Sequence, residues 1–204
     1  MKPSLFIFQF FLLTFSFAQN NVILNDEFIN NSNAWQEEKT GDGSTNIHDK
    51  RGFYIIQHKR NYEAWTAWKE LEINENRDFE IEASFYKDNG VKNYGYGILW
   101  GGTDNNYYSF MITGNGYFCV GKVVDGDWTD ITPDGWIKTN VVSEGNNKYN
   151  SLIARKKGGT YEFEINNTLV LKIKCGTFFG NKIGFNVNNK QRILVDWIRI
   201  KYLN

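Results

Sequence analysis

The chain has 204 residues, with 23 Lys and Arg balancing 23 Asp and Glu, so its formal net charge at pH 7 is zero. No basic stripe runs along it, which argues against nucleic acid as a partner. Aromatic residues make up 17% of the chain, Pro occurs only twice, and Asn- and Gly-rich turns recur without a sustained helical period. Short strands separated by frequent turns predict an all-β protein, a sandwich or a barrel.

The first 18 residues (MKPSLFIFQFFLLTFSFA) begin with one Lys, continue with an apolar run and end in Ser16, Phe17 and Ala18. This order is typical of a secretory signal peptide cut before Gln19. Its apolar run is short for a membrane span. We therefore expect an exported protein, periplasmic, on the cell surface or extracellular. Residues 19–204 then form one β-sandwich domain without a membrane span.

The first strands expected in chain order are residues 22–28, 52–59 and 79–85, with a polar loop or short edge strand over residues 37–49. Trp65 and Trp68 follow the second of these strands. We expect them close together near a rim, where they are either buried or frame a ligand.

Residues 79–85 (FEIEASF) alternate, so that one face carries apolar residues and the other carries Glu80 and Glu82, with Asp78 just before them. Retaining glycosidases need two carboxyl groups roughly 5–5.5 Å apart, and next neighbours on one strand face are about 6.6–6.8 Å apart at Cα. Glu80 and Glu82 are therefore the one carboxylate pair that suggests catalysis. The alternative is a solvated outer face that balances Lys and Arg on adjacent strands, which is much commoner.

The central residues 93–128 predict an antiparallel meander of three strands, 94–100, 107–113 and 117–124, joined by turns rich in Gly and Asn. Period-2 alternation places two sets of residues on opposite faces of the first strand. They are Tyr94, Tyr96, Ile98 and Trp100 on one face, and Gly95, Gly97, Leu99 and Gly101 on the other. Small residues on one face let a neighbouring layer or a ligand approach the backbone closely.

The aromatic residues of this stretch have two interpretations. They fill a core, because Tyr and Trp bury large areas and favour strands, or they form a platform on which sugar rings stack. The residues expected to be exposed are those at turns, Tyr107, Trp128 and Trp136.

Five further strands are expected after a polar loop, at residues 151–155, 160–165, 169–174, 182–187 and 193–202. In the third of them Leu169, Leu171 and Ile173 are predicted to face the core. Lys172 and Lys174 are predicted to oppose Glu162 and Glu164 across strands, a pairing that fixes register.

Cys119 and Cys175 each lie in a strand-like run, and the spacing leaves open whether they pair. We expect two buried thiols. The histidines, His48 and His58, have no partners at ligand intervals, so we expect no metal site. No cofactor is predicted either.

The order of these pieces resembles the concanavalin A-like lectin/glucanase superfamily. It is similar in particular to exported bacterial modules related to laminin-G-like and 3-keto-disaccharide hydrolase-like domains. The residues that carry the likeness lie within 52–202, namely 78–85, 94–101, 107–117, 128–133, 161–167, 184–187 and 195–200. The resemblance implies a jelly-roll sandwich of two antiparallel sheets.

Three functions are in competition. The first is an exported, non-catalytic module that binds a glycan or cell-surface polysaccharide through rim aromatics, for which we name Tyr96, Trp100, Tyr108 and Trp128. The second is a structural or protein-interaction module with every aromatic in the core. The third is a glycoside hydrolase that uses Glu80 and Glu82. It ranks last, because the glucanase pattern acid-x-Asp-x-acid is replaced here by Asp78-Phe79-Glu80-Ile81-Glu82.

Overall fold

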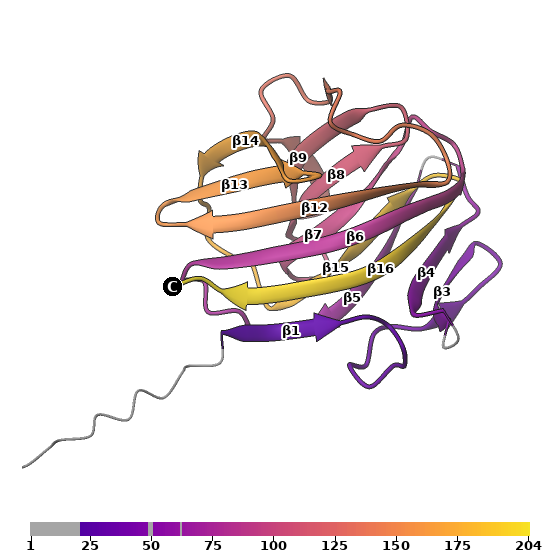
Figure 1. Cartoon of the computed structure of the whole chain (residues 1–204), viewed down its shortest axis with the longest axis horizontal. Helices are drawn as coiled ribbons and strands as arrows, with labels where there is room; N and C mark the ends of the chain where they lie inside the picture. The colour runs from indigo at the N-terminus through magenta and orange to yellow at the C-terminus, as the bar shows by residue number, and fades with distance from the viewer. Residues whose placement is uncertain (1–20, 49–50, 62) are drawn as a thin grey trace, which may run out of the picture.

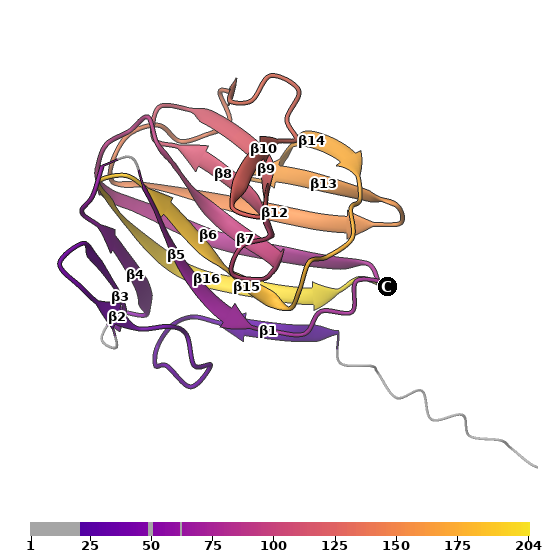
Figure 2. The ribbon, with the colours of Figure 1, turned by 180° about the vertical axis from the view of Figure 1, so that it is seen from behind.

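The computed structural model describes residues 21–48, 51–61 and 63–204, so the predicted signal peptide, residues 1–18, lies outside it. The described residues form sixteen strands and no helix, and the strands make two antiparallel sheets packed face to face (Figure 1, Figure 2). The predicted all-β sandwich is confirmed. Within these residues no helix is long and apolar enough to cross a membrane.

The larger sheet has nine strands in the order β14-β13-β12-β6-β16-β4-β3-β2, and β1 also pairs with β16. We call it the large sheet. Its strands are β1 (Val22–Asp26), β2 (Glu38–Lys39), β3 (Gly43–His48), β4 (Phe53–His58), β6 (Phe79–Gly90), β12 (Lys148–Lys157), β13 (Thr160–Ile165), β14 (Thr168–Lys174) and β16 (Gln191–Tyr202).

The second sheet, here the small sheet, has seven strands in the order β10-β9-β8-β7-β15-β5, and β11 also pairs with β9. Its strands are β5 (Ala64–Glu70), β7 (Gly95–Gly102), β8 (Tyr107–Thr113), β9 (Tyr117–Val124), β10 (Asp127–Asp130), β11 (Ile137–Lys138) and β15 (Lys182–Asn188). The predicted meander is confirmed as β7, β8 and β9, which pair in sequence.

Two hairpins show why the turns fall where they do. The turn from β9 to β10 places Asp125 and Gly126 at φ 53° and 90°, and the turn from β13 to β14 places Asn166 and Asn167 at 50° and 63°. Two-residue hairpin loops favour this left-handed conformation, which Gly, Asn and Asp tolerate best. The turn residues therefore set the register of both hairpins.

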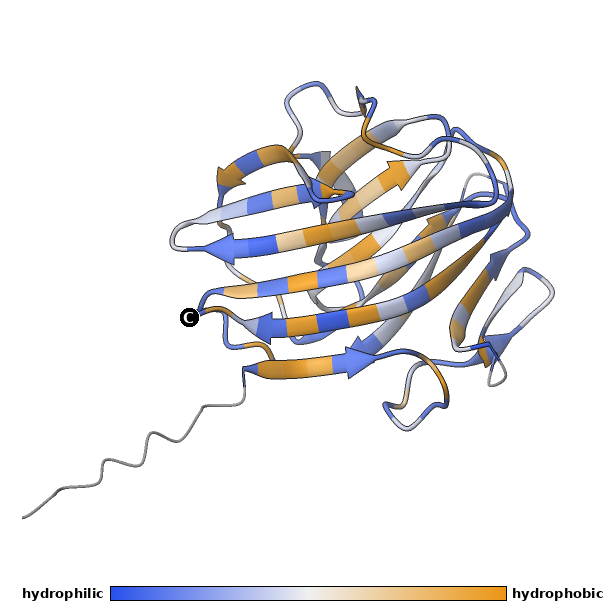
Figure 3. Ribbon diagram, viewed as in Figure 1, coloured by the Kyte–Doolittle hydropathy of each residue, from blue (hydrophilic) through white to orange (hydrophobic). Residues whose placement is uncertain are grey.

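The core lies between the two sheets and is rich in rings. Phe110 of the small sheet meets Phe163 of the large sheet edge-on at 5.1 Å, and Phe85 meets Tyr96 at 5.9 Å in the same way. Figure 3 shows hydrophobic and hydrophilic residues alternating along much of β6, β12 and β16. The hydrophobic ones contribute to this core. Large aromatic side chains bury the most apolar area per residue, so they dominate the stability of such a sandwich.

A β-bulge corrects one prediction at the edge of the large sheet. The register shifts between Phe163 and Glu164, so that Leu169 is 53% exposed and Val170 packs against the core in its place. The extra residue of a bulge reverses the faces of all residues beyond it. Lys172 does oppose Glu162, as predicted, whereas Lys174 opposes Thr160 and not a carboxylate.

Trp65 and Trp68 do not lie together, contrary to expectation. Both belong to β5, where residues three positions apart point to opposite faces of the strand. Trp65 packs on the core side, near His58 at 6.0 Å between ring centroids. Trp68 lies on the outer side and meets Tyr107 edge-on at 5.2 Å.

Candidate functional site

The outer face of the small sheet carries a hollow of about 580 Å³. Its walls come from segments far apart in the sequence, which the order of strands in the sheet brings together. The residues that line it are Glu63, Ala64, Tyr94, Tyr107, Met111, Val123, Gly126, Trp128, Trp136, Asn186 and Asn188. We call it the small-sheet hollow.

Glycines let two indole rings lie directly on the backbone of this sheet. A Cβ at Gly121 of β9 would collide with the ring of Trp128, and one at Gly95 of β7 would lie 2.6 Å from Cη2 of Trp136. A Cβ atom essentially never lies this close to another heavy atom. The two indole rings can therefore keep these positions only over Gly. The glycine face of the meander is therefore the floor under the rings of the hollow.

The indoles are held but remain open to solvent. Trp128 is 39% exposed and Trp136 38%, and the Nε1–H of Trp128 donates to Oδ1 of Asp130 at 2.7 Å. Tyr107 is half-buried and is supported from behind by Trp68. Rings whose orientation is fixed before a ligand arrives lose little conformational entropy on binding.

Two amide side chains, those of Asn186 and Asn188, line the hollow. Asn186 is 4% exposed, and its Nδ2 faces Sδ of Met111 at 3.1 Å and Oδ1 of Asn188 at 3.3 Å. Its own Oδ1 has no hydrogen-bond partner among the described residues. A buried acceptor without a partner is costly, so this oxygen lowers the stability of the sheet around the hollow.

No Lys or Arg lines the small-sheet hollow in the part of the chain that the structure describes. Its one lining carboxylate, that of Glu63, accepts hydrogen bonds from the exposed Arg60. The hollow therefore offers rings and amides without a cation that would attract an acidic group.

A second depression, of about 480 Å³, adjoins the hollow at Ala64 and continues past the edge strand β5. Its lining includes Trp68 and the ion pair between Lys182 and Asp104. The two depressions together make an elongated surface on one side of the small sheet.

Three of the four predicted ligand-binding residues lie elsewhere. Tyr96 and Trp100 have no exposed area and Tyr108 is 7% exposed, because the aromatic face of the meander is the inner face. The expectation that they form a rim is thereby corrected. Of the four predicted ligand-binding residues, only Trp128 lines the small-sheet hollow. Turn position correctly predicts exposed rings for Trp128 and Trp136, whereas Tyr107, for which exposure is also predicted, is half-buried. Nothing in the sequence singles out Asn186 or Asn188.

Glu80 and Glu82 lie on the other sheet, on the outer face of β6. Glu80 accepts from Nε of Arg155 at 2.6 Å and from Nζ of Lys201 at 2.9 Å. Burial would raise the pKa of Glu80, but the hydrogen bonds from Lys201 and Arg155 outweigh it and lower that pKa. Burial and the neighbouring Glu80 carboxylate raise the pKa of Glu82. A carboxylate paired with two cations in this way is typical of a structural ion-pair network, which also shifts pKa values.

The thiols and histidines supply no further site. Cys119 is free and buried, as expected, and burial raises its pKa to about 12, whereas Cys175 is free and half-buried. Burial lowers the pKa of His58, whose Nδ1 lies 3.0 Å from the carbonyl of Asn189. Among residues 21–48, 51–61 and 63–204, no three His, Cys, Asp or Glu side chains are grouped to hold a metal ion.

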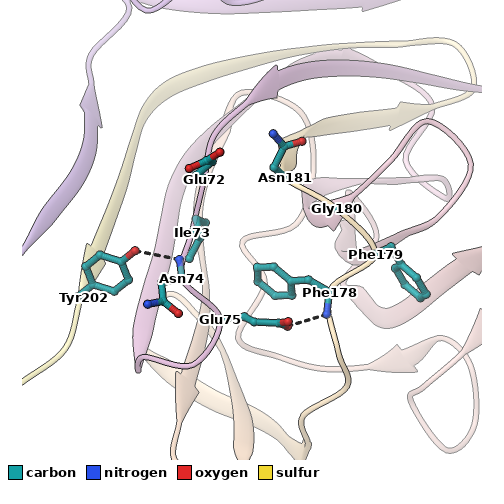
Figure 4. A pocket seen from close by; sticks show the side chains of 9 residues that line it. All are labelled: Glu72, Ile73, Asn74, Glu75, Phe178, Phe179, Gly180, Asn181 and Tyr202. Atoms are coloured by element: carbon teal, nitrogen blue, oxygen red, sulfur yellow. Dashed lines mark hydrogen bonds between the residues drawn. The ribbon is translucent and has the colours of Figure 1, made fainter.

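Another hollow, of about 640 Å³, lies between residues 72–75, residues 178–181 and Tyr202 (Figure 4). The Glu75 carboxylate accepts the backbone N–H of Phe178 at 2.7 Å, and the Tyr202 hydroxyl accepts that of Asn74 at 2.9 Å. These bonds tie two loops and the last strand together. Two of its polar side chains, those of Glu75 and Tyr202, are thus engaged by backbone N–H groups.

The sequence matches no protein-family model and no curated protein. Solved structures do resemble it. The β-glucanase of Bacillus licheniformis has a TM-score of 0.62 at 10% identity, over 91% of this chain and 99% of that one. The Emp47p carbohydrate recognition domain has 0.62 at 13%, over 92% and 99%. The carbohydrate-binding module CBM66 from Bacillus subtilis has 0.53 at 15%, over 82% and 94%.

Some neighbours are much larger, since this chain spans only 38% of a xylan β-1,4-xylosidase from Bacillus halodurans. At such identities the likeness shows the fold alone. The chain has the jelly-roll β-sandwich of concanavalin A-like lectins and glucanases. Sandwich folds of this kind serve many functions, so the ligand of this protein depends on its own residues.

Proposed function

We propose that this protein is a non-catalytic module that binds carbohydrate in the small-sheet hollow. The observation that carries the proposal is the pair of half-exposed indoles, Trp128 and Trp136, that lie on glycines of the sheet. Sugar rings present apolar C–H faces that pack on aromatic rings, and hydroxyls that bond to amides such as that of the partly exposed Asn188. The fold neighbours that are named as carbohydrate-binding support the same assignment.

The charges of the hollow favour a neutral glycan. No Lys or Arg is among its described lining residues, and the cation at its margin, Arg60, is already paired with the Glu63 carboxylate, so the lining offers no unpaired cation to a uronic or sialic acid. The adjoining depression beyond Ala64 gives room for further sugar units along the surface. We therefore assign to the hollow a neutral oligosaccharide or polysaccharide.

Export agrees with this role. The signal-peptide pattern of residues 1–18 supports a protein that acts in the periplasm, on the cell surface or outside the cell, where polysaccharides are found. A neutral cell-surface or extracellular polysaccharide is the partner that we propose.

The test is calorimetric titration of residues 19–204 with matched neutral and acidic oligosaccharides. We expect saturable binding of at least one neutral glycan, and Trp128→Ala and Trp136→Ala each to weaken it about tenfold, the size of a ring that is a binding hot spot. Trp197→Ala is the matched control, because Trp197 lies on the large sheet beside Arg199. Folded protein that binds no glycan, or binds one equally well in both variants, would overturn the proposal in favour of a structural or protein-binding module.

A further inference from the structure

The two indole rings of the small-sheet hollow lie over different strands of the sheet. The Cζ2 and Cη2 end of Trp128 lies on Gly121 of β9, and the same end of Trp136 lies on Gly95 of β7. Strand β8 runs between β7 and β9 (Figure 2). The two rings therefore cover separate points of the sheet, and the strand register gives the distance between those points.

The register places the two glycines far apart. Gly121 pairs with Ser109 of β8, and Gly95 pairs with Thr113 of the same strand, four residues further on. With about 3.4 Å per residue along β8 and about 4.8 Å between neighbouring strands, Gly95 and Gly121 are roughly 17 Å apart. The indole rings themselves span part of this distance, and the rest still exceeds the length of one sugar ring. One sugar unit therefore cannot stack on both indoles.

A single hollow of about 580 Å³ takes in both indoles. Between them its floor includes Met111 of β8, which pairs with Gly97 of β7 and Cys119 of β9. These three residues are buried, so none of their side chains rises between the rings as an exposed barrier. A chain of sugar units thus has an open path from one indole to the other.

The two ends of this path have different neighbours. Tyr107 of β8 lies in the same row across the strands as Trp128 of β10. At the other end, antiparallel pairing of β15 with β7 places the partly exposed Asn188 beside Gly95, the glycine under Trp136. A sugar on Trp128 therefore meets a second ring, whereas a sugar on Trp136 meets an amide that bonds to its hydroxyls.

We infer that the small-sheet hollow holds two sugar subsites, one on Trp128 and one on Trp136 with Asn188. Its ligand is then a linear glycan long enough to reach both indoles. This inference rests on the proposed carbohydrate binding and adds to it that the two rings contact different sugar units of one chain.

Calorimetric titration of residues 19–204 with the disaccharides and hexasaccharides of β-1,4-linked glucose, mannose, xylose and galactose tests the inference. For a sugar that binds, we expect the hexasaccharide to bind more than about tenfold more tightly than the disaccharide, because only the longer chain reaches the second indole. In Trp128→Ala and in Trp136→Ala this advantage should shrink to the few-fold that a longer chain gains from its greater number of binding positions. Trp197→Ala, on the large sheet, is the matched control and should keep the full advantage.

A double-mutant cycle tests the place of Asn188. Asn188→Ala combined with Trp136→Ala should lose less hexasaccharide affinity than the two single losses together, because both residues act on one sugar unit. Its combination with Trp128→Ala should be additive, because that ring acts on another unit. Coupling of Asn188 to Trp128 and not to Trp136 would overturn the arrangement.

The outcomes of the titration separate the two proposals. Folded protein that binds none of these saccharides would overturn carbohydrate binding and this inference with it. If instead the hexasaccharide kept its whole advantage over the disaccharide in either tryptophan variant, the two subsites would be wrong and carbohydrate binding would stand.

Discussion

The outer faces of the two sheets differ in how far their polar side chains are paired with one another. On the large sheet, Arg155 bonds to Glu80 and Glu164, Lys201 to Glu80, and Lys172 to Glu162. On the small sheet, exposed indoles lie on glycines, and an amide oxygen of Asn186 has no partner. Groups that satisfy one another hold strands in register, whereas exposed rings without a covering layer are available to a ligand. The comparison assigns stability to the charged face and binding to the face with rings and amides.

The largest effect should come from a ring on the inner face of the small sheet. We expect Trp100→Ala to lower the free energy of unfolding by about 4 kcal/mol, since it removes a buried ring and leaves a cavity. Trp136→Ala, a ring of the outer face of the same sheet, should cost less than about 1 kcal/mol. Urea unfolding measures both. Similar losses would mean that the exposed indole is a structural residue.

A change on the large sheet should cost stability without touching binding. Arg155 is 21% exposed and holds two carboxylates, so Arg155→Met should lower the free energy of unfolding by about 2 kcal/mol. Lys138→Met is the control, because its pair with Glu144 is half-exposed and is worth less than about 0.5 kcal/mol. Glycan affinity should be the same in both proteins. A weaker affinity in Arg155→Met would break the division between the two faces.

Sequence periodicity predicted strands well and faces only in part. β8, β9 and β13 have the bounds expected from alternation and turn residues, because both signals are local. Alternation separates Tyr96 and Trp100 from Gly95 and Gly97 correctly. Alternation does not predict which set faces the other sheet. In the structure the rings of Tyr96 and Trp100 face it.

The small-sheet hollow could not be predicted from local sequence, because strand pairing brings its residues together. Asn186 meets Met111 because β15 pairs with β7 and β7 with β8, and such pairing joins residues about 75 positions apart in the chain. The bulge that exposes Leu169 is likewise set by pairing with β13 and not by the residues of β14. Exposed turn rings were the one part of the site with a local signal.

The smallest effects on stability are expected at Glu80 and Glu82, which the sequence does not distinguish from each other. The lowered pKa of Glu80 means that its charge stabilises the fold above the usual value of 4.5, and that this contribution is lost as the pH falls through the lowered pKa. The raised pKa of Glu82 has the opposite sign, since its charge costs stability once the pH rises through 4.5 towards the raised value.

At pH 7, Glu80→Gln should therefore destabilise the protein by about 1 kcal/mol, and Glu82→Gln should be neutral or slightly stabilising. Urea unfolding from pH 3 to 7 measures the two differences, and the Glu80→Gln loss should shrink towards pH 3. If both variants lost stability equally at pH 7, Glu82 would belong to the same ion-pair network as Glu80. If instead Glu82→Gln abolished the breakdown of a glycan that the unmodified protein degrades, the charged face would be the catalytic one and the assignment of the two faces would be reversed.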